Sequence, residues 1–196
     1  MDDFQVFLLN GVTGSGKTEV YMHAIAKRLS AGLQVLFLVP EIGLAPQTIT
    51  RLTERFSVPV IALHSGLTPV KRLNGWRQVT VPGPMIVIGT RLAVFAPFSR
   101  LGLVVVDEEH DLSFKQQAGF RYSARDVAVK RCYDEGIPII LGSATPSIES
   151  LHAVKESRYQ VLRLTQRVGG DTPPLISIVD MKKVKTHSGL SVGLVE

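Results

Sequence analysis

Eight residues near the N-terminus, Gly11-Val12-Thr13-Gly14-Ser15-Gly16-Lys17-Thr18, restrict the possible folds of this chain more than any other feature. They follow an apolar run at residues 6–9 and precede a segment of helical character, so they predict a strand, a glycine-rich loop and a helix. Glycines let backbone N–H groups turn inward around an anion, and the helix N-terminus adds partial positive charge. The pattern therefore indicates a phosphate-binding loop.

We expect all eight residues of this loop to bind ATP. Lys17 has the length to reach the β- and γ-phosphates, and the Thr18 hydroxyl is the type of group that ligates Mg²⁺ next to such a loop. A glycine-rich turn before an ordinary surface helix is the alternative, and the motif and its setting make it much the weaker one.

Strand-sized apolar runs alternate with helix-like segments along most of the chain. We expect further strands at residues 35–39, 60–63, 85–88, 103–106 and 139–141, and helices at residues 19–31, 45–56, 69–79, 124–135 and 147–154. This alternation predicts an α/β fold in which right-handed crossovers build a mostly parallel sheet with helices on both faces. Residues 167–196 are rich in turn-forming residues, so we expect the domain to span residues 1–166 and a linker to follow. Residues 176–179 are a candidate strand within that tail.

Composition excludes several classes of protein. No apolar run is long enough for a membrane span, and the acidic start Met1-Asp2-Asp3 differs from a secretory signal, which favours a cytoplasmic location. A single cysteine, Cys132, excludes an internal disulfide and a cysteine-based zinc site within these residues. The net charge of +5 is compatible with a polyanionic partner but does not establish one.

A second motif, Asp107-Glu108-Glu109-His110, follows the apolar run at residues 103–106. The carboxyl end of a buried parallel strand is the edge where α/β folds bind their ligands. We expect Asp107 to hold the Mg²⁺ together with Thr18, and Glu108 to orient and deprotonate the attacking water. A strand that ends in a solvated acidic turn is the alternative.

A third motif, Gly142-Ser143-Ala144-Thr145-Pro146, follows the expected strand at residues 139–141. The hydroxyl groups of Ser143 and Thr145 can hydrogen-bond Glu108 or His110, and so couple the nucleotide site to a second ligand. Ser147 is also a candidate N-cap for the next helix, and the two interpretations are compatible.

These motifs, in this order, resemble the first motor lobe of superfamily 2 helicases of the DEAH type. The segments that carry a closer resemblance, to the primosomal replication-restart helicases, are GVTGSGKTEVY, VPEIGLAPQT, LHSGL, IVIGTR, DEEH and ILGSATPS. The resemblance covers residues 4–180 and implies a RecA-like P-loop lobe of an ATP-dependent 3′-to-5′ DNA helicase. It implies ATP and Mg²⁺ as cofactors, single-stranded or forked DNA as ligand, and primosome and single-strand-binding proteins as partners of a complete family member. We expect the chain to be a monomer.

The resemblance also implies a path for single-stranded DNA. Backbone N–H groups, a hydroxyl and a guanidinium suit phosphate oxygens without reading sequence. The residues that fall at the corresponding positions are Pro40, Glu41, Gln47, Gly89, Thr90 and Arg91. A solvated surface arginine is the alternative interpretation of Arg91.

Aromatic and basic residues are interleaved directly after the acidic motif. This segment is similar to the aromatic-rich loop that couples DNA occupancy to ATP hydrolysis in the family, and we expect it to contact DNA through Phe114, Lys115, Phe120, Tyr122 and Arg125. The alternative is that the rings pack a long loop onto the sheet. We further expect residues 116–120 to be exposed or disordered without DNA.

Complete members of the resembled family carry a DNA-binding region before this lobe, a second motor lobe and a zinc insertion, none of which occurs in these residues. Because a second lobe supplies an arginine finger, we expect this chain to bind nucleotide weakly and to hydrolyse it slowly. Two alternatives stay open at the level of sequence. One is another P-loop NTPase, such as a small-molecule kinase, and the other is a non-catalytic interaction module.

Overall fold

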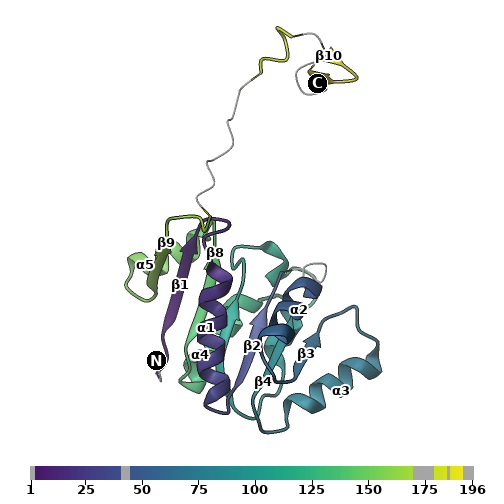
Figure 1. Ribbon diagram of the computed structural model, residues 1–196, viewed down its shortest axis with the longest axis vertical. Coiled ribbons are helices and arrows are strands. Elements are labelled where there is room, and N and C mark those ends of the chain that lie inside the picture. Colours follow the sequence, from purple (N-terminus) through teal and green to yellow (C-terminus); the bar gives the residue numbers. More distant parts are fainter. Residues whose placement is uncertain (1–2, 41–44, 170–178, 185, 192–196) are drawn as a thin grey trace.

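A seven-stranded sheet forms the centre of the computed structural model, with strand order β3-β4-β2-β5-β8-β1-β9 and every pair of neighbouring strands parallel. The structure describes residues 3–40, 45–169, 179–184 and 186–191. The strands of this sheet are β1 (Val6–Gly11), β2 (Gln34–Leu38), β3 (Val60–Leu63), β4 (Met85–Gly89), β5 (Leu101–Val106), β8 (Ile139–Ser143) and β9 (Gln160–Leu164). The predicted parallel α/β architecture is confirmed (Figure 1).

Helices cover both faces of the sheet. They are α1 (Lys17–Ser30), α2 (Ala45–Arg55), α3 (Pro69–Val79), α4 (Ala124–Glu135) and α5 (Ile148–Lys155), with 3₁₀ turns η2 (Arg91–Phe95) and η3 (Leu112–Phe114). Two further pairs of short strands form antiparallel ladders, namely β6 (Lys115–Gln116) with β7 (Tyr122–Ser123), and β10 (Thr186–His187) with β11 (Leu190–Ser191). None of the helices in the described ranges is long and apolar enough to span a bilayer.

Alternation along the strands divides the core into two layers. In β2, for example, Val35 and Phe37 pack with Tyr21 and Ile25 of α1, whereas Leu36 and Leu38 belong to the layer on the opposite face, with α4. Successive side chains of a strand point to opposite faces, so a strand covered on both sides is apolar throughout. This explains why the strand-forming segments are continuous apolar runs.

Local capping sets the ends of the helices on the second face. Thr68 accepts a hydrogen bond from the amide of Lys71 at the start of α3, where proline occupies the first helical position. Ser123 caps α4 in the same way, and Gly136 ends it in the left-handed conformation that glycine adopts readily. These signals explain why the predicted helices at residues 69–79 and 124–135 match the structure to the residue.

Other boundaries differ from the prediction. Helix α1 begins at Lys17 rather than residue 19, and α2 ends at Arg55 rather than residue 56. Strand β9 and the β6–β7 hairpin were not predicted. Strand β9 lies at the edge of the sheet, so its exposed positions weaken the apolar pattern, and the hairpin strands are only two residues long. The candidate strand at residues 176–179 falls almost wholly outside the described residues.

Candidate nucleotide site and adjoining loops

The glycine-rich loop adopts a conformation that requires glycine at two positions. Gly14 and Gly16 have φ angles of 77° and 90°, in the left-handed region where a Cβ atom causes strain. The Lys17 ammonium donates a hydrogen bond to the Gly11 carbonyl oxygen at 2.8 Å, which holds the side chain over the loop. The buried Ser15 hydroxyl has no hydrogen-bond partner among the described residues. A concave anion-binding turn with an unsatisfied polar group suits a phosphate ligand.

The predicted phosphate and metal ligands line one pocket of about 1010 Å³. Its lining includes Thr13 to Thr18 of the loop and, from the end of β5, Asp107 and Glu108. Helix α2 contributes Arg51, Glu54 and Arg55 to the opposite wall. The pocket has the donors for a triphosphate and, in the Thr18 hydroxyl and the Asp107 carboxylate, oxygen ligands of the kind Mg²⁺ prefers. The residues present therefore fit a nucleotide and its metal.

The sheet order explains how the three motifs come together. The phosphate loop follows β1 and the acidic motif follows β5, and β8 lies between these two strands. The Ser143 motif at the end of β8 is thus placed between the loop and the acids. This insertion puts the predicted coupling residues next to both halves of the nucleotide site.

Tyr21 of α1 is a site residue to which the sequence analysis assigned no role. Its side chain is fully buried, and its hydroxyl donates a hydrogen bond to Asp107 Oδ1 at 3.0 Å. A Cβ atom on Gly142 of β8 would lie 1.5 Å from the Tyr21 hydroxyl oxygen, so only glycine lets the phenol pass over the strand. Tyr21 lies four residues after Lys17, one helical turn further along α1. This spacing was the sequence signal that could have placed Tyr21 at the site.

Burial dominates the electrostatics of Asp107. Desolvation raises the pKa of this carboxyl, and hydrogen bonds from Tyr21 and from the Glu108 amide together with the charge of Lys17 oppose that rise. A buried carboxylate is costly without a cation, so the position of Asp107 fits the metal ligand that the sequence predicts.

Glu108 lies in a strained turn. Its φ angle of 47° is in the left-handed region, and the turn is closed by a hydrogen bond from the Asp111 amide to the Glu108 carbonyl at 2.8 Å. The Glu108 amide donates to Asp107 Oδ1 at 3.1 Å. Its carboxylate remains partly exposed, 3.6 Å from His110 Nδ1. Non-glycine residues in this conformation cluster at functional sites, where the surrounding contacts hold them.

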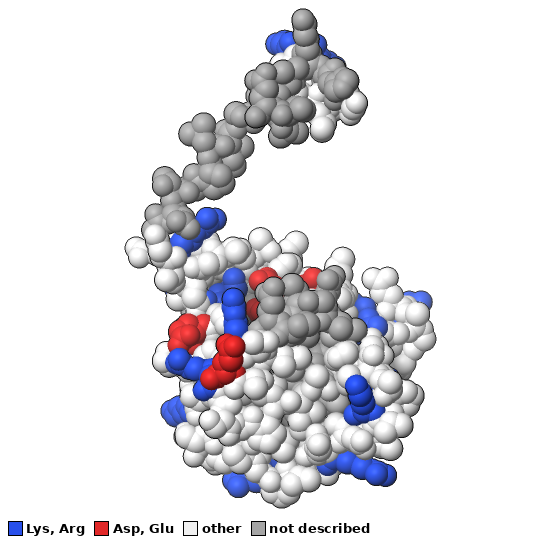
Figure 2. Space-filling view, turned by 45° about the vertical axis from the view of Figure 1, so that its right-hand side comes forward, with Lys and Arg blue, Asp and Glu red and all other residues white. Residues whose placement is uncertain are grey.

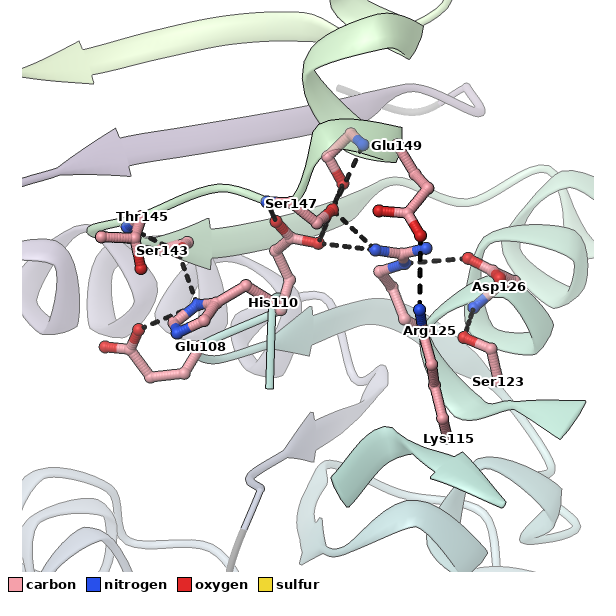
Figure 3. A network of polar contacts seen from close by, with 12 residues as sticks. Glu108, His110, Lys115, Ser123, Arg125, Asp126, Ser143, Thr145, Ser147 and Glu149 are labelled. Carbon is pink, nitrogen blue, oxygen red and sulfur yellow. Dashed lines mark hydrogen bonds and ion pairs between the residues drawn. The ribbon is translucent and has the colours of Figure 1, made fainter. Parts of the chain in front are cut away.

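Two of the predicted coupling residues are in direct contact. The Ser143 hydroxyl and His110 Nδ1 lie 2.8 Å apart, and the amide of Thr145 donates to the Ser143 hydroxyl oxygen at 2.9 Å (Figure 3). Glu108, His110, Ser143 and Thr145 thus form one chain of polar contacts between β5 and β8. Ser147 caps α5 as predicted, and the coupling role of Ser143 and Thr145 stays a prediction.

The third acid of the motif, Glu109, anchors a second network and was also missed. Its side chain is fully buried and accepts hydrogen bonds from Arg125 Nη1 at 3.0 Å, the Ser147 amide at 2.7 Å and the Ser150 hydroxyl at 2.9 Å. The Ser147 hydroxyl donates to the same carboxylate at 3.0 Å. The network ties the acidic turn to the start of α4 and of α5. Sequence spacing gives no signal for it, because the donors lie 16 to 41 residues away.

Two side chains predicted to bind DNA are unavailable in this structure, and that part of the prediction is wrong here. Phe114 is only 1% exposed and belongs to the core layer of α4. The Arg125 side chain is 7% exposed and is committed to Glu109, Asp126 and Ser147. Burial in the core excludes stacking on a base, and a guanidinium held by two carboxylates is not free for a phosphate.

Several other residues predicted to contact DNA lie close together after the ends of β2 and β4. The Ser113 hydroxyl donates to the Pro40 carbonyl at 2.8 Å, and Arg91 Nη1 donates to the carbonyls of Ser113 and Lys115 at 3.3 and 3.4 Å. Arg91 is therefore half-buried and braces the hairpin rather than being a solvated surface arginine. Gly89 and Thr90 lie directly before Arg91. A Cβ atom on Gly89 would lie 2.4 Å from the Leu63 carbonyl oxygen, which is too close for any residue but glycine. Glu41 and the side chain of Gln47 lie outside the described part of the chain.

The hairpin presents its tip to solvent, as predicted for residues 116–120. Phe120 is 81% exposed, and its ring lies 6.1 Å from that of the half-buried Tyr122. Lys115 pairs with Glu149 of α5 at 3.3 Å. Among the three rings considered, Phe114 packs inward while Phe120 and Tyr122 remain accessible.

Positive charge is not gathered into a single stripe on the face seen in Figure 2. Lys and Arg side chains are scattered over it, and the acidic side chains gather in one part beside basic ones. The nucleotide pocket itself mixes Glu19 and Glu54 with Arg51 and Arg55. Any attraction for a polyanion on this face therefore rests on particular side chains rather than on a general basic surface.

Within the described residues, no group of three or more His, Cys, Asp or Glu side chains is arranged to hold a metal.

Comparison with known proteins agrees with this geometry. The family model described as DEAD/DEAH box helicase matches residues 3–154. Replication restart protein PriA of Haemophilus influenzae is 48% identical over 193 residues, which are 98% of this chain and 26% of that protein. The PriA protein of Bacillus subtilis is 43% identical over 195 residues, which are 100% of this chain and 24% of the relative. The chain thus spans about a quarter of the length of these curated relatives.

Solved structures show the same fold. The structure of RecG bound to a three-way DNA junction matches 84% of this chain and 21% of its own, with a TM-score of 0.61 and 27% identity. A DEAD box protein from Methanococcus jannaschii matches 82% of this chain and 45% of its own, with a TM-score of 0.60 and 16% identity. The predicted resemblance to replication-restart helicases and the RecA-like fold are confirmed, and the kinase and interaction-module alternatives are not favoured.

Proposed function

The chain belongs to the DEAD/DEAH box helicase family, and we propose that it is the ATP-binding first motor lobe of a 3′-to-5′ DNA helicase acting in replication restart. One observation carries the proposal. The phosphate loop, the predicted metal ligands and the predicted base line a single pocket, and Tyr21 joins α1 to Asp107 across β8. The likeness to PriA proteins supports the assignment to replication restart.

Each residue of the pocket has a defined task in this proposal. Lys17 neutralises the terminal phosphates, and the loop amides orient them. Thr18 and Asp107 hold Mg²⁺, which supplies charge neutralisation at the phosphates when bound. Glu108, partly exposed at the pocket wall, accepts a proton from the attacking water. His110 and Ser143 link that carboxylate to the end of β8, and so to the rest of the lobe.

The same proposal assigns single-stranded DNA to the edge formed by Pro40, Thr90, Arg91 and the hairpin. RecG, which the chain resembles, is a protein solved with a DNA junction, and this supports a nucleic-acid ligand. Phe120 offers an exposed ring and Tyr122 a partly exposed one for stacking, and Arg91 holds the start of the hairpin through the Ser113 and Lys115 carbonyls. In the longer protein we expect primosome and single-strand-binding proteins as partners.

Substitution of the loop lysine tests the nucleotide site directly. Lys17→Ala removes the ammonium that faces the phosphates, so Mg²⁺-dependent binding of a fluorescent ATP analogue should weaken at least ~100-fold. Lys27→Ala, on an exposed turn of the same helix, is the matched control and should bind like the wild type. Equal affinity of the two variants would contradict the proposed site. Hydrolysis by the chain alone should be slow and should rise when a second lobe is supplied.

A further inference from the structure

Phe95 lies beside Tyr122, the half-buried ring of the hairpin, although it comes from a different part of the chain. Its ring lies 5.1 Å from that of Tyr122 at an interplanar angle of 65°, and Tyr122 is in turn 6.1 Å from Phe120. Tyr122 is therefore the middle member of a row of three rings. Phe95 is the last residue of η2, which begins at Arg91, whereas the other two rings belong to the hairpin.

The geometry of η2 explains why Phe95 faces outward. Residues three apart eclipse each other in a 3₁₀ helix, so Leu92 and Phe95 share one face. Ala93 and Val94 are buried against the sheet, whereas Leu92 is 45% exposed and Phe95 43% exposed. An outward-facing ring of this size gains little from the core, and its only ring contact in the described residues is Tyr122.

We propose that Phe95 is a third base-stacking residue, which extends the hairpin surface of Phe120 and Tyr122 to bind unpaired bases of a nucleic-acid strand. The inference rests on the proposed function. Every base has a π-face, so a row of rings binds single strands with little regard to sequence. None of the motifs that predict the DNA path contains Phe95.

Charge beside the rings identifies the occupant as a polyanion rather than an apolar peptide. Arg121 separates Phe120 from Tyr122 in the chain, is exposed, and makes no ion pair with any described residue. Arg121 and Lys115 line a groove of about 610 Å³ together with Tyr122. Rings that accept bases next to cations that accept phosphates are the two requirements of a single-strand site.

Anisotropy titrations with a fluorescent oligo-dT and an oligo-rU of equal length test the inference. Phe95→Leu keeps an apolar side chain but removes the π-face, so binding of the single strands should weaken about 5- to 150-fold, the loss of one stacked base. Phe95→Tyr should bind like the wild type. Leu92→Ala, on the same face of η2 with the same exposure, is the control for lost apolar surface and should change affinity less than twofold. Binding of a blunt duplex should be unaffected by Phe95→Leu.

The Tyr122→Ala background separates stacking by Phe95 from support of Tyr122. A stacking Phe95 still contributes there, so the double variant should bind more weakly than Tyr122→Ala alone. If the two bind equally, Phe95 only supports Tyr122 and the inference is wrong. A direct reading comes from Phe95→Trp, whose fluorescence should be quenched by oligo-dT relative to the wild type, in which Trp76 is the one tryptophan.

The outcomes distinguish this inference from the proposed function. If Phe95→Leu binds single strands like the wild type while Tyr122→Ala weakens binding, the inference fails and the proposed DNA edge stands. If the wild-type chain binds neither single strand, the proposed DNA edge and the inference both fail.

Discussion

Single side chains decide the geometry of the proposed metal site, and Tyr21 is the clearest case. It is buried in the α1 layer of the core, yet its hydroxyl reaches Asp107 by passing over Gly142. The contact joins the phosphate-loop helix to the acidic motif by a hydrogen bond that spans 86 residues. Partners of this kind orient metal ligands and keep them charged, and their loss commonly weakens metal binding 10- to 100-fold, by rough estimate.

Tyr21→Phe keeps the ring and removes the hydrogen bond. Burial already raises the pKa of Asp107, and the Tyr21 hydroxyl opposes that rise, so the variant should hold a less ionised and less oriented carboxylate. We expect the Mg²⁺ concentration needed for half-maximal binding of the ATP analogue to rise roughly tenfold. Tyr133→Phe, which changes an exposed tyrosine of α4, is the control, and an unchanged Mg²⁺ requirement in Tyr21→Phe would show that Tyr21 only packs.

Short elements at the carboxyl edge of the sheet depend on one another through Ser147. It caps α5 by accepting from the Ser150 amide at 3.2 Å, and it contacts both partners of the buried Glu109–Arg125 pair. Thr68, the cap of α3, makes only the corresponding hydrogen bond to a helix amide. The structure of α5 is therefore coupled to the acidic turn.

Ser147→Ala should destabilise the chain more than Thr68→Ala does. Loss of a cap alone costs about 1 kcal/mol of unfolding free energy, which is our expectation for Thr68→Ala. At Ser147 the substitution also leaves a buried ion pair with fewer hydrogen bonds, so we expect about 2–4 kcal/mol. Urea denaturation followed by circular dichroism measures both values. Equal losses would mean that the network adds nothing to the cap.

At the scale of the whole molecule, the chain beyond β9 returns to the nucleotide site. The amide of Val168 donates to the Gly14 carbonyl at 2.9 Å, and its side chain lines the pocket. The predicted domain end at residue 166 lies before this contact. The assignment of residues 167–196 to a linker stays a prediction. We predict that the functional lobe includes Val168.

Two truncated chains test this boundary. A chain of residues 1–169 keeps the Val168 contact and should bind the ATP analogue like the full chain. A chain of residues 1–166 loses one hydrogen bond to the phosphate loop and should bind about fivefold more weakly, the effect of about 1 kcal/mol. Both should unfold at the same temperature, because the sheet ends at Leu164. Identical affinities would place the boundary where the sequence predicts it.

The sequence by itself determined the features that depend on neighbours along the chain. The phosphate loop, six of the seven strands of the large sheet and the ends of α3 and α4 follow from glycine positions, apolar runs and capping residues, whose physical effects act within a few residues. Only the tertiary structure decided which distant groups meet: Tyr21 with Asp107, Glu109 with Arg125, and Phe95 with Tyr122. Whether a ring or a charge faces solvent or the core depends on strand order and packing, and neither is encoded in local spacing. For this reason Phe114 and Arg125 proved buried despite a pattern typical of a surface loop.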